Sequence, residues 1–89
     1  MEFEWDEEKR LRNIRKHKLD FVQAQLLFDG RPQLTWRSKF AAEERWQTTG
    51  IVDGDLYTVI WTSRGNAVRF ISARRARDAE ERAYRALHS

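Results

Sequence analysis

Residues 67–84 have the sequence AVRFISARRARDAEERAY, which predicts a buried strand followed by a charged helix. Within nine residues of this segment lies a cluster of four arginines, with no acid among them until Asp78: Arg69, Arg74, Arg75 and Arg77. Because a strand fixes the directions of its side chains, guanidinium groups near its end can be held rigidly enough to grip phosphate in a forked geometry. The segment therefore favours RNA or DNA as a ligand over a small neutral metabolite.

The length of 89 residues predicts a single domain over residues 1–89 with one modest core, because so short a chain buries only about 60–65% of its unfolded surface. Cysteine is absent, which excludes disulfides and thiolate metal sites and fits a reducing cytoplasm. The acidic start MEFEWDEEKR is unlike a signal peptide, and no apolar run approaches the roughly 20 residues that span a bilayer. We expect a soluble cytoplasmic protein with no membrane association and no cofactor.

The net charge is only +3, but the charges are strongly segregated along the chain. Residues 2–8 carry five acids and no base, whereas residues 9–18 carry six bases and no acid. Residues 64–77 carry five more bases without an acid. Two such basic blocks predict a basic face that attracts polyanions in a salt-dependent way, although each block alone also fits a solvated surface of mixed charge.

The N-terminal part predicts a short strand and two helices. Phe3 and Trp5 alternate with acidic residues, which is the period of a half-buried strand. Asp6 is placed to cap a helix that runs to Lys18 with acids in its first turn and bases in its last. A second helix starts at Asp20, with a capping-box relation to Gln23, and stops at the Asp29-Gly30 pair.

The rest of the chain predicts an antiparallel sheet and a final helix, and hence an α+β fold. The sheet has a possible edge strand and three central strands, at 33–38, 45–52, 56–63 and 67–74. Tight turns are expected at Asp53-Gly54 and Arg64-Gly65, and a loop over 38–44. Apolar residues stand at both odd and even positions of the last two strands, which indicates that helices cover both faces of the sheet. The final helix runs from Asp78, as its cap, to about Leu87.

Catalytic candidates are few. The two histidines are far apart in sequence, which disfavours a metal site, and phosphate-binding glycine loops and nucleophile elbows are absent. RNA cleavage without a metal needs a proton acceptor for a 2′-hydroxyl, cations for the phosphate charge and an acid for the leaving oxygen. His17 is the only well-placed side chain that titrates near neutrality, but as a residue of the last helical turn it also fits a C-cap.

Three further residues allow two interpretations each. Arg74 ends a strand, where it either binds phosphate or forms an ion pair with Glu80 or Glu81. Glu80 and Tyr84 share a helix face, either as a structural pair or as an acid/base and stacking pair at a nucleotide. Trp5, Trp46 and Trp61 are expected in the core, whereas Trp36, on the edge strand, could stack on a base or fill a pocket of a partner.

Three segments together resemble the BrnT family of toxin–antitoxin ribonucleases, over about residues 3–84: FEWDEEKRLRNIRKHKLDFVQAQLLFDG, EERWQTTG and TSRGNAVRFISARRARDAEERAY. The most specific positions are Trp5, Asp6, Lys9, Asn13, Lys16, His17, Phe21, Glu44, Arg45, Gly50, Ile71, Ser72, Ala73, Arg74, Ala76, Glu80 and Tyr84. Any one of these positions is a weak signal, but their order and spacing together are specific.

The resemblance implies a RelE-like fold, in which two N-terminal helices and one C-terminal helix pack on a twisted, mostly antiparallel sheet. It implies a metal-independent endoribonuclease that inhibits translation and arrests growth. It also implies a ribbon–helix–helix antitoxin of the BrnA type as the partner in a hetero-oligomer that binds operator DNA only as the complex.

Carried onto this chain, the resemblance and the basic blocks together nominate two sets of site residues. The catalytic candidates are His17, Arg64, Arg74, Glu80 and Tyr84, and the RNA-binding candidates are Lys16, Arg45, Arg69 and Arg75. One departure is that family members often have Thr or Ser at the position of Arg77, as the cap of the last helix; here Asp78 is expected to cap instead.

We expect folding to gather Arg64 and Arg74 into one anion-binding pocket beside the last helix. The rival hypothesis is a non-catalytic basic module that binds a protein or nucleic acid.

Overall fold

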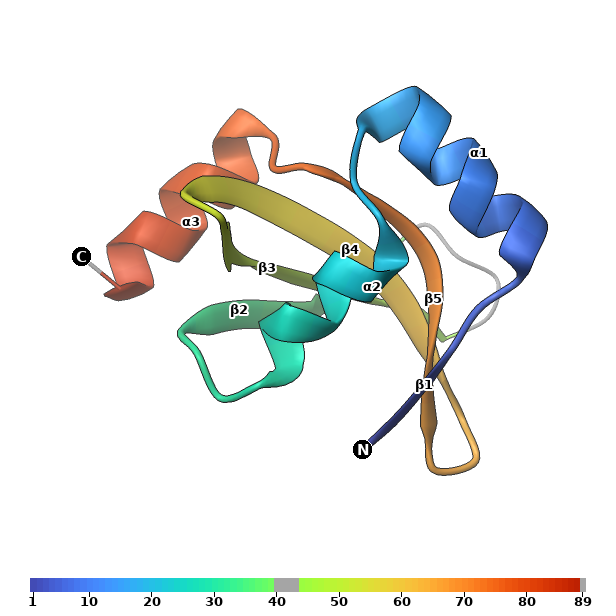
Figure 1. Cartoon of the computed structure of the whole chain (residues 1–89). Coiled ribbons are helices and arrows are strands. Elements are labelled where there is room, and N and C mark those ends of the chain that lie inside the picture. Colours follow the sequence, from blue (N-terminus) through green and yellow to red (C-terminus); the bar gives the residue numbers. More distant parts are fainter. Residues whose placement is uncertain (40–43, 89) are drawn as a thin grey trace.

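The computed structural model describes residues 1–39 and 44–88, and within them the chain forms a mixed sheet with helices (Figure 1). The elements in chain order are β1 (Glu2–Glu4), α1 (Glu7–His17), α2 (Phe21–Ala24), the 3₁₀ segment η1 (Gln25–Phe28), β2 (Gln33–Arg37), β3 (Trp46–Val52), β4 (Asp55–Arg64), β5 (Ala67–Arg75) and α3 (Asp78–His88). The α+β class expected from the sequence is confirmed. The loop expected over 38–44 falls largely outside the described residues.

The sheet has the strand order β1-β5-β4-β3-β2, so β2 is an edge strand as expected. The short β1 runs parallel to β5, and the other neighbouring pairs are antiparallel. Asp53 and Gly54 join β3 to β4 with φ angles of 51° and 86°, which suits the two-residue turn predicted there. The next turn begins one residue later than predicted, at Gly65, because Arg64 still pairs with Ala67.

The hydrophobic core lies on the sheet face that α2 and η1 cover, and its centre is Phe70 of β5. The ring of Phe70 has four aromatic neighbours with centroid distances of 5.4–6.1 Å: Phe3, Trp5, Phe21 and Phe28. Trp61 packs against this cluster, and Trp46 stacks on Trp61 at 6.0 Å. Trp5 and Trp61, which were expected in the core, are half-buried and pack against its buried residues, and Trp46 is half-buried against Trp61. Burial of so much aromatic area is a large stabilising contribution in a chain of this size.

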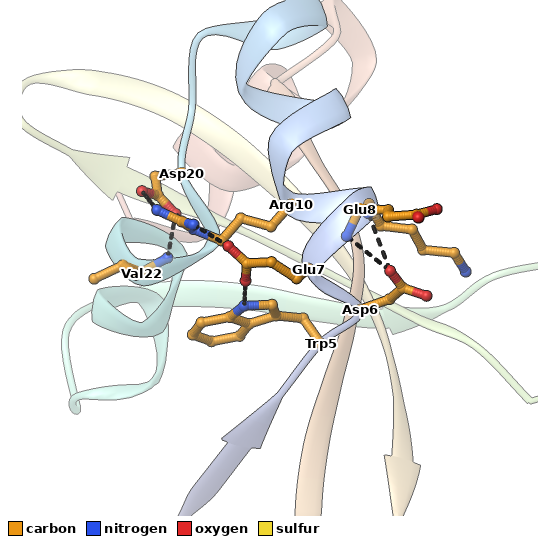
Figure 2. A network of polar contacts seen from close by, with 8 residues as sticks. Trp5, Asp6, Glu7, Glu8, Arg10, Asp20 and Val22 are labelled. Carbon is orange, nitrogen blue, oxygen red and sulfur yellow. Dashed lines mark hydrogen bonds and ion pairs between the residues drawn. The ribbon is translucent and has the colours of Figure 1, made fainter.

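The caps predicted for the first two helices are present. The Asp6 carboxylate accepts hydrogen bonds from the N–H groups of Glu8 and Lys9 at the start of α1 (Figure 2). Asp20 forms a complete capping box with Gln23. Arg10 links the two helices, because its guanidinium donates to both oxygens of Asp20 at 2.8 and 3.0 Å. The second helix is α-helical for only four residues and continues as the tighter η1.

One buried side chain fixes α1 against the sheet. The strand β1 pairs with β5 only as far as Arg69, which leaves the next part of that β5 edge without a strand partner. Asn13 of α1 replaces it: its amide oxygen accepts from the Ala73 N–H at 3.0 Å, and its amide nitrogen donates to the Ala73 carbonyl at 2.8 Å. The same nitrogen donates to the Leu19 carbonyl, so Asn13 also holds the chain that leaves the helix.

A second buried side chain, Glu80, fixes α3 on the opposite face of the sheet. Its carboxylate accepts from the Thr58 hydroxyl of β4 at 2.9 Å and forms a two-bond ion pair with Arg74 of β5. The Arg77 N–H also donates to Glu80, and the Arg77 carbonyl accepts from the Glu81 N–H. The prediction that Asp78 caps the helix is therefore wrong: Asp78 is its first residue, and Arg77 holds the cap position because Glu80 satisfies its N–H.

Replacement of Asn13 by Ala is expected to lower the free energy of unfolding by about 2–3 kcal/mol, because it leaves the buried peptide groups of Ala73 without partners. Denaturant unfolding of the variant measures the loss. The exposed Arg15→Ala on the same helix is the control and should change stability little. An unchanged midpoint for Asn13→Ala would show that the amide does not hold α1.

The stability of the protein is also expected to depend on Glu80 in a pH-dependent way. Burial raises the pKa of Glu80, but the Arg74 guanidinium, the Arg77 N–H and the Thr58 hydroxyl outweigh it, so the pKa lies below its ordinary value. A lowered pKa in the folded state stabilises the protein above the unfolded pKa, and this contribution is lost as the pH falls through the folded pKa.

At pH 7 Glu80→Gln should therefore unfold more easily by about 1–3 kcal/mol, because a charged hydrogen-bonding partner is lost. The gap to the wild type should narrow as the pH falls below the ordinary glutamate pKa toward the lower folded-state pKa of Glu80, because the wild type loses the contribution of its carboxylate over that range. Unfolding curves from pH 3 to pH 7 test this, and a gap that stays constant over that range would contradict it.

Candidate functional site

The face of the sheet that carries α3 is only partly covered by that helix. Along β4, Val59 and Trp61 point to the core, so Thr58, Ile60 and Thr62 point to the α3 side. Beyond Thr58 this side has three adjoining hollows, of about 180, 280 and 330 Å³, which all share Ile71. We call the cations that line them the basic face: Lys9, Arg12, Lys16, Arg45, Arg64, Arg69, Arg74 and Arg77.

A β-bulge places Ile71 where the hollows meet. Opposite Ile60 and Trp61 of β4 stand Ser72 and Phe70, so Ile71 between them has no cross-strand partner. The extra residue lets Ile71 and Ser72, which are consecutive, both line the open side of the sheet. Bulges of this kind often re-aim side chains beside functional sites, and here the bulge forms the floor of the basic face.

The smallest hollow lies between α1 and the bulge. Lys9, Arg12 and Lys16 recur at spacings of three and four residues and so share one side of the helix, and His17 follows them. Burial lowers the pKa of His17, and the positive charges of Lys16 and Arg74 lower it further. His17 is therefore a neutral imidazole at neutral pH, surrounded by fixed positive charge, and can accept a proton beside an anion.

A second hollow lies at the far end of the sheet, beside the β4–β5 hairpin. Arg45, Arg64 and Arg69 line it together with Lys9. One carboxylate oxygen of Glu4 stands 3.7 Å from Arg64 and equally far from Arg69, and this buried oxygen accepts no hydrogen bond from the described residues. These distances exceed those of a tight ion pair, so both guanidiniums keep donors for another anion.

The third hollow joins the bulge to α3 and contains Arg74, Arg77 and Arg45. Arg74 forms an ion pair with Glu80, which is one of the two interpretations that the sequence allowed for this arginine. Its bonds to Glu80 and to the Arg75 carbonyl use three of its five N–H donors, which leaves two without a partner among the described residues. The guanidinium is thus oriented by Glu80 without being fully occupied.

The arrangement departs from the single pocket expected for Arg64 and Arg74. In the β4–β5 register Arg64 lies opposite Ala67, whereas Arg74 lies opposite Thr58, six residues further along β4. At about 3.3 Å per residue the two positions are roughly 20 Å apart. They share one face but stand at its two ends, so the expected compact pocket beside the last helix is wrong: the cations form an extended track.

Two of the nominated residues lie away from this track. Arg75 alternates with Arg74 and turns to the other face, where it pairs with Asp55 at 3.1 Å and lies over the Tyr57 ring. Tyr84 of α3 is buried, contacts the ring of His88 and borders a separate hollow with Arg31 and Ile51. The other nominated residues lie on or beside the basic face: Lys16, His17, Arg45, Arg64, Arg69, Arg74 and Glu80.

Sequence reasoning did not nominate some residues of this surface. Lys9 stood out through the resemblance and a basic block, and Arg12 through the basic block alone, although their helical spacing from Lys16 already placed them on one side of α1. Ile71 and Ser72 stood out only through the resemblance, because the bulge that exposes both depends on pairing with β4. Asn13 stood out only through the resemblance, and its contact with β5 joins residues 60 positions apart.

Within residues 1–39 and 44–88, no three His, Asp or Glu side chains are grouped so that they could hold a metal ion. None of the helices in the same part of the chain has the length and apolarity needed to span a bilayer.

Comparison with protein families gives a match that covers most of this architecture. The family described as ribonuclease toxin, BrnT, of type II toxin–antitoxin system matches residues 5–80, from Trp5 just before α1 through Glu80. A comparison with curated proteins found no match. The matched range holds every cation of the basic face together with His17, Asn13 and Glu80. The chain belongs to the BrnT family of ribonuclease toxins from type II toxin–antitoxin systems.

Proposed function

We propose that this chain cleaves RNA on the basic face, through attack of a 2′-hydroxyl on the neighbouring phosphate. The bond from phosphorus to the 5′-oxygen breaks, the leaving 5′-oxygen takes a proton from water, and a 2′,3′-cyclic phosphate is left on the other product. The observation that carries the proposal is the meeting of three cation-lined hollows at Ile71, with His17 at the edge of one of them. An extended track of this kind suits the evenly spaced phosphates of a single strand better than it suits a compact anion.

His17 acts as the base in this proposal. A 2′-hydroxyl is a weak acid, so its attack needs a neutral acceptor within hydrogen-bond reach. The lowered pKa keeps His17 neutral at physiological pH, and the cations that lower it also attract the substrate. The lowered pKa of His17 fits the C-cap interpretation poorly, because the dipole at the C-terminal end of a helix favours the protonated imidazole.

Arg74 stabilises the charge that develops on the phosphate during attack. Glu80 positions this guanidinium from behind, with two hydrogen bonds that fix its plane. Lys16 contributes positive charge beside His17, and Arg45, Arg64 and Arg69 hold phosphates further along the strand. In this scheme Glu80 is a positioning residue and Tyr84 supports it by anchoring the next turn of α3.

The remaining parts of the proposal concern its cellular setting. We propose a cytoplasmic, metal-independent enzyme, in which arginine and lysine supply the positive charge at the phosphate, and a RelE-like arrangement of the final strands and α3. Cleavage of RNA halts translation until a ribbon–helix–helix antitoxin binds, and operator DNA is bound only by that complex. The membership in a toxin–antitoxin family supports the existence of an antitoxin partner.

Replacement of His17 by Ala is expected to slow RNA cleavage by about 10²–10⁴-fold, because the proton acceptor is removed. Purified, antitoxin-free protein is incubated with labelled RNA, with and without ribosomes, and rates are measured from pH 5 to pH 8. For the wild type the rate should fall as the pH drops through the His17 pKa, which lies below about 6.5, and products should carry 2′,3′-cyclic phosphate ends.

Arg15→Ala is the matched control, because Arg15 is an exposed cation of the same helical turn that lines none of the three hollows. It should retain the wild-type rate and pH profile. Equal rates for His17→Ala and the wild type would remove His17 from the chemistry. An absence of cleavage by the wild type in all conditions would count against the enzyme.

Expression of the wild type in a bacterium is expected to arrest growth, because cleaved RNA cannot be translated. His17→Ala should relieve the arrest, and so should co-expression of the antitoxin. Optical density and the integrity of total RNA are followed after induction. Normal growth with intact RNA would favour the rival interpretation of a non-catalytic module that binds a protein or nucleic acid.

A further inference from the structure

A groove between β2 and α3 adjoins the basic face and has a different character. It has a volume of about 530 Å³, and its apolar lining comes from Leu34 and Trp36 of β2 and from Ala79 and Ala83 of α3. The two alanines carry no atoms beyond Cβ, so they leave space over the indole ring that a larger residue would fill. We call this the Trp36 groove.

Among the residues that the structure describes, Trp36 is the tryptophan whose indole has neither a ring contact nor a hydrogen bond. Trp5 stacks on Phe70, and Trp46 and Trp61 stack on each other. The indole N–H groups of Trp5 and Trp61 donate to Glu7 and Thr48, respectively. Within the described part of the chain, neither a ring nor a hydrogen-bond acceptor contacts Trp36 in this way.

Polar and positive groups surround the groove in positions that suit a nucleotide. Ser38 and the side-chain amide of Gln47 stand at its mouth, where they can bond to base edges. Arg37, Lys39 and Arg77 form a positive rim, and none of them is in an ion pair with a described carboxylate. The rim is complementary in charge to phosphates that flank an inserted base.

The groove is continuous with the proposed cleavage site. Ser38, Gln47 and Arg77 line both the Trp36 groove and the hollow that contains Arg74. A strand that crosses the basic face at Arg74 therefore passes the mouth of the groove, and a base one or two nucleotides away can turn into it. An acidic peptide would use the rim charges but would not need the unpartnered π face of the indole.

We propose that the Trp36 groove is a nucleobase subsite, in which one unpaired base of the RNA next to the cleaved phosphate stacks on Trp36. This inference rests on the proposed RNA cleavage and adds the position that holds the substrate in register. Stacking on an aromatic ring is tolerant of base identity, and Ser38 and Gln47 would supply the hydrogen bonds that discriminate among bases.

The test compares the wild type, Trp36→Ala, Trp36→Phe and Val22→Ala in binding and in cleavage. Val22→Ala is the control, because Val22 is an exposed apolar residue of α2, on the core side of the sheet. Binding is measured by fluorescence anisotropy with a labelled single-stranded 2′-O-methyl oligonucleotide, which cannot be cleaved. A second oligonucleotide carries abasic sites throughout, so it keeps the phosphates and lacks every base.

We expect Trp36→Ala to weaken binding of the complete oligonucleotide at least about fivefold, while Trp36→Phe restores most of the affinity. The abasic oligonucleotide should bind all four proteins equally. It has no base that could stack on residue 36, so a change of that residue removes no further interaction. On cleavable RNA, Trp36→Ala should raise KM and leave kcat unchanged, which a general structural defect would not do. Val22→Ala should match the wild type throughout.

Equal affinity of Trp36→Ala and the wild type for the complete oligonucleotide would overturn the subsite, even if the wild type cleaves RNA normally. Weakened binding of the antitoxin with unchanged RNA binding would also overturn it, and would identify the groove as a protein-docking surface. Failure of the wild type to cleave RNA, with the Trp36-dependent binding intact, would instead refute only the proposed catalysis. If the wild type binds no oligonucleotide at all, both proposals fail.

Discussion

The side chain of Asn13 is the constraint on which the architecture of the basic face depends. The strand β1 is too short to cover the edge of β5, and an uncovered buried edge would leave peptide groups without partners. The amide of Asn13 makes the two bonds to Ala73 that another strand would make, and thereby sets the distance and orientation of α1. Lys16 and His17, one turn further on, reach the bulge at Ile71 only because the helix is held there.

Glu80 has the same function at the other end of this face. It ties α3 to Thr58 and Arg74, and at the same time it orients the guanidinium that we assign to the phosphate. A buried carboxylate needs a compensating partner, and Arg74 provides it. The two helices that flank the site are therefore each fastened by one buried polar side chain, and each fastening touches or adjoins a proposed functional group. In the proposed scheme, the contacts that stabilise the fold therefore also position the groups that bind the substrate.

Local features were predictable to within a residue or two. The caps at Asp6 and Asp20, the Asp53-Gly54 turn and the boundaries of β3, β4 and β5 follow from short-range chemistry, which acts within a few positions. The errors were also short-range: Glu80 satisfies Arg77 and so keeps the cap there, and Arg64 remains paired so that the turn moves to Gly65. Alternation along β5 also separates Arg75 from Arg74, a consequence of strand geometry that the count of basic residues had obscured.

By itself the sequence determined the secondary elements, the two basic blocks and, through the order of its motifs, the family. These depend on residue types at short spacing, which are visible in one dimension. Only the tertiary structure decided which cations share a surface, because that depends on contacts such as Asn13 with Ala73 and Thr58 with Glu80. It turned an expected pocket into a track about 20 Å long, and it left the Trp36 indole without a ring or hydrogen-bond partner among the described residues, because strand register and helix placement set the distances between remote segments.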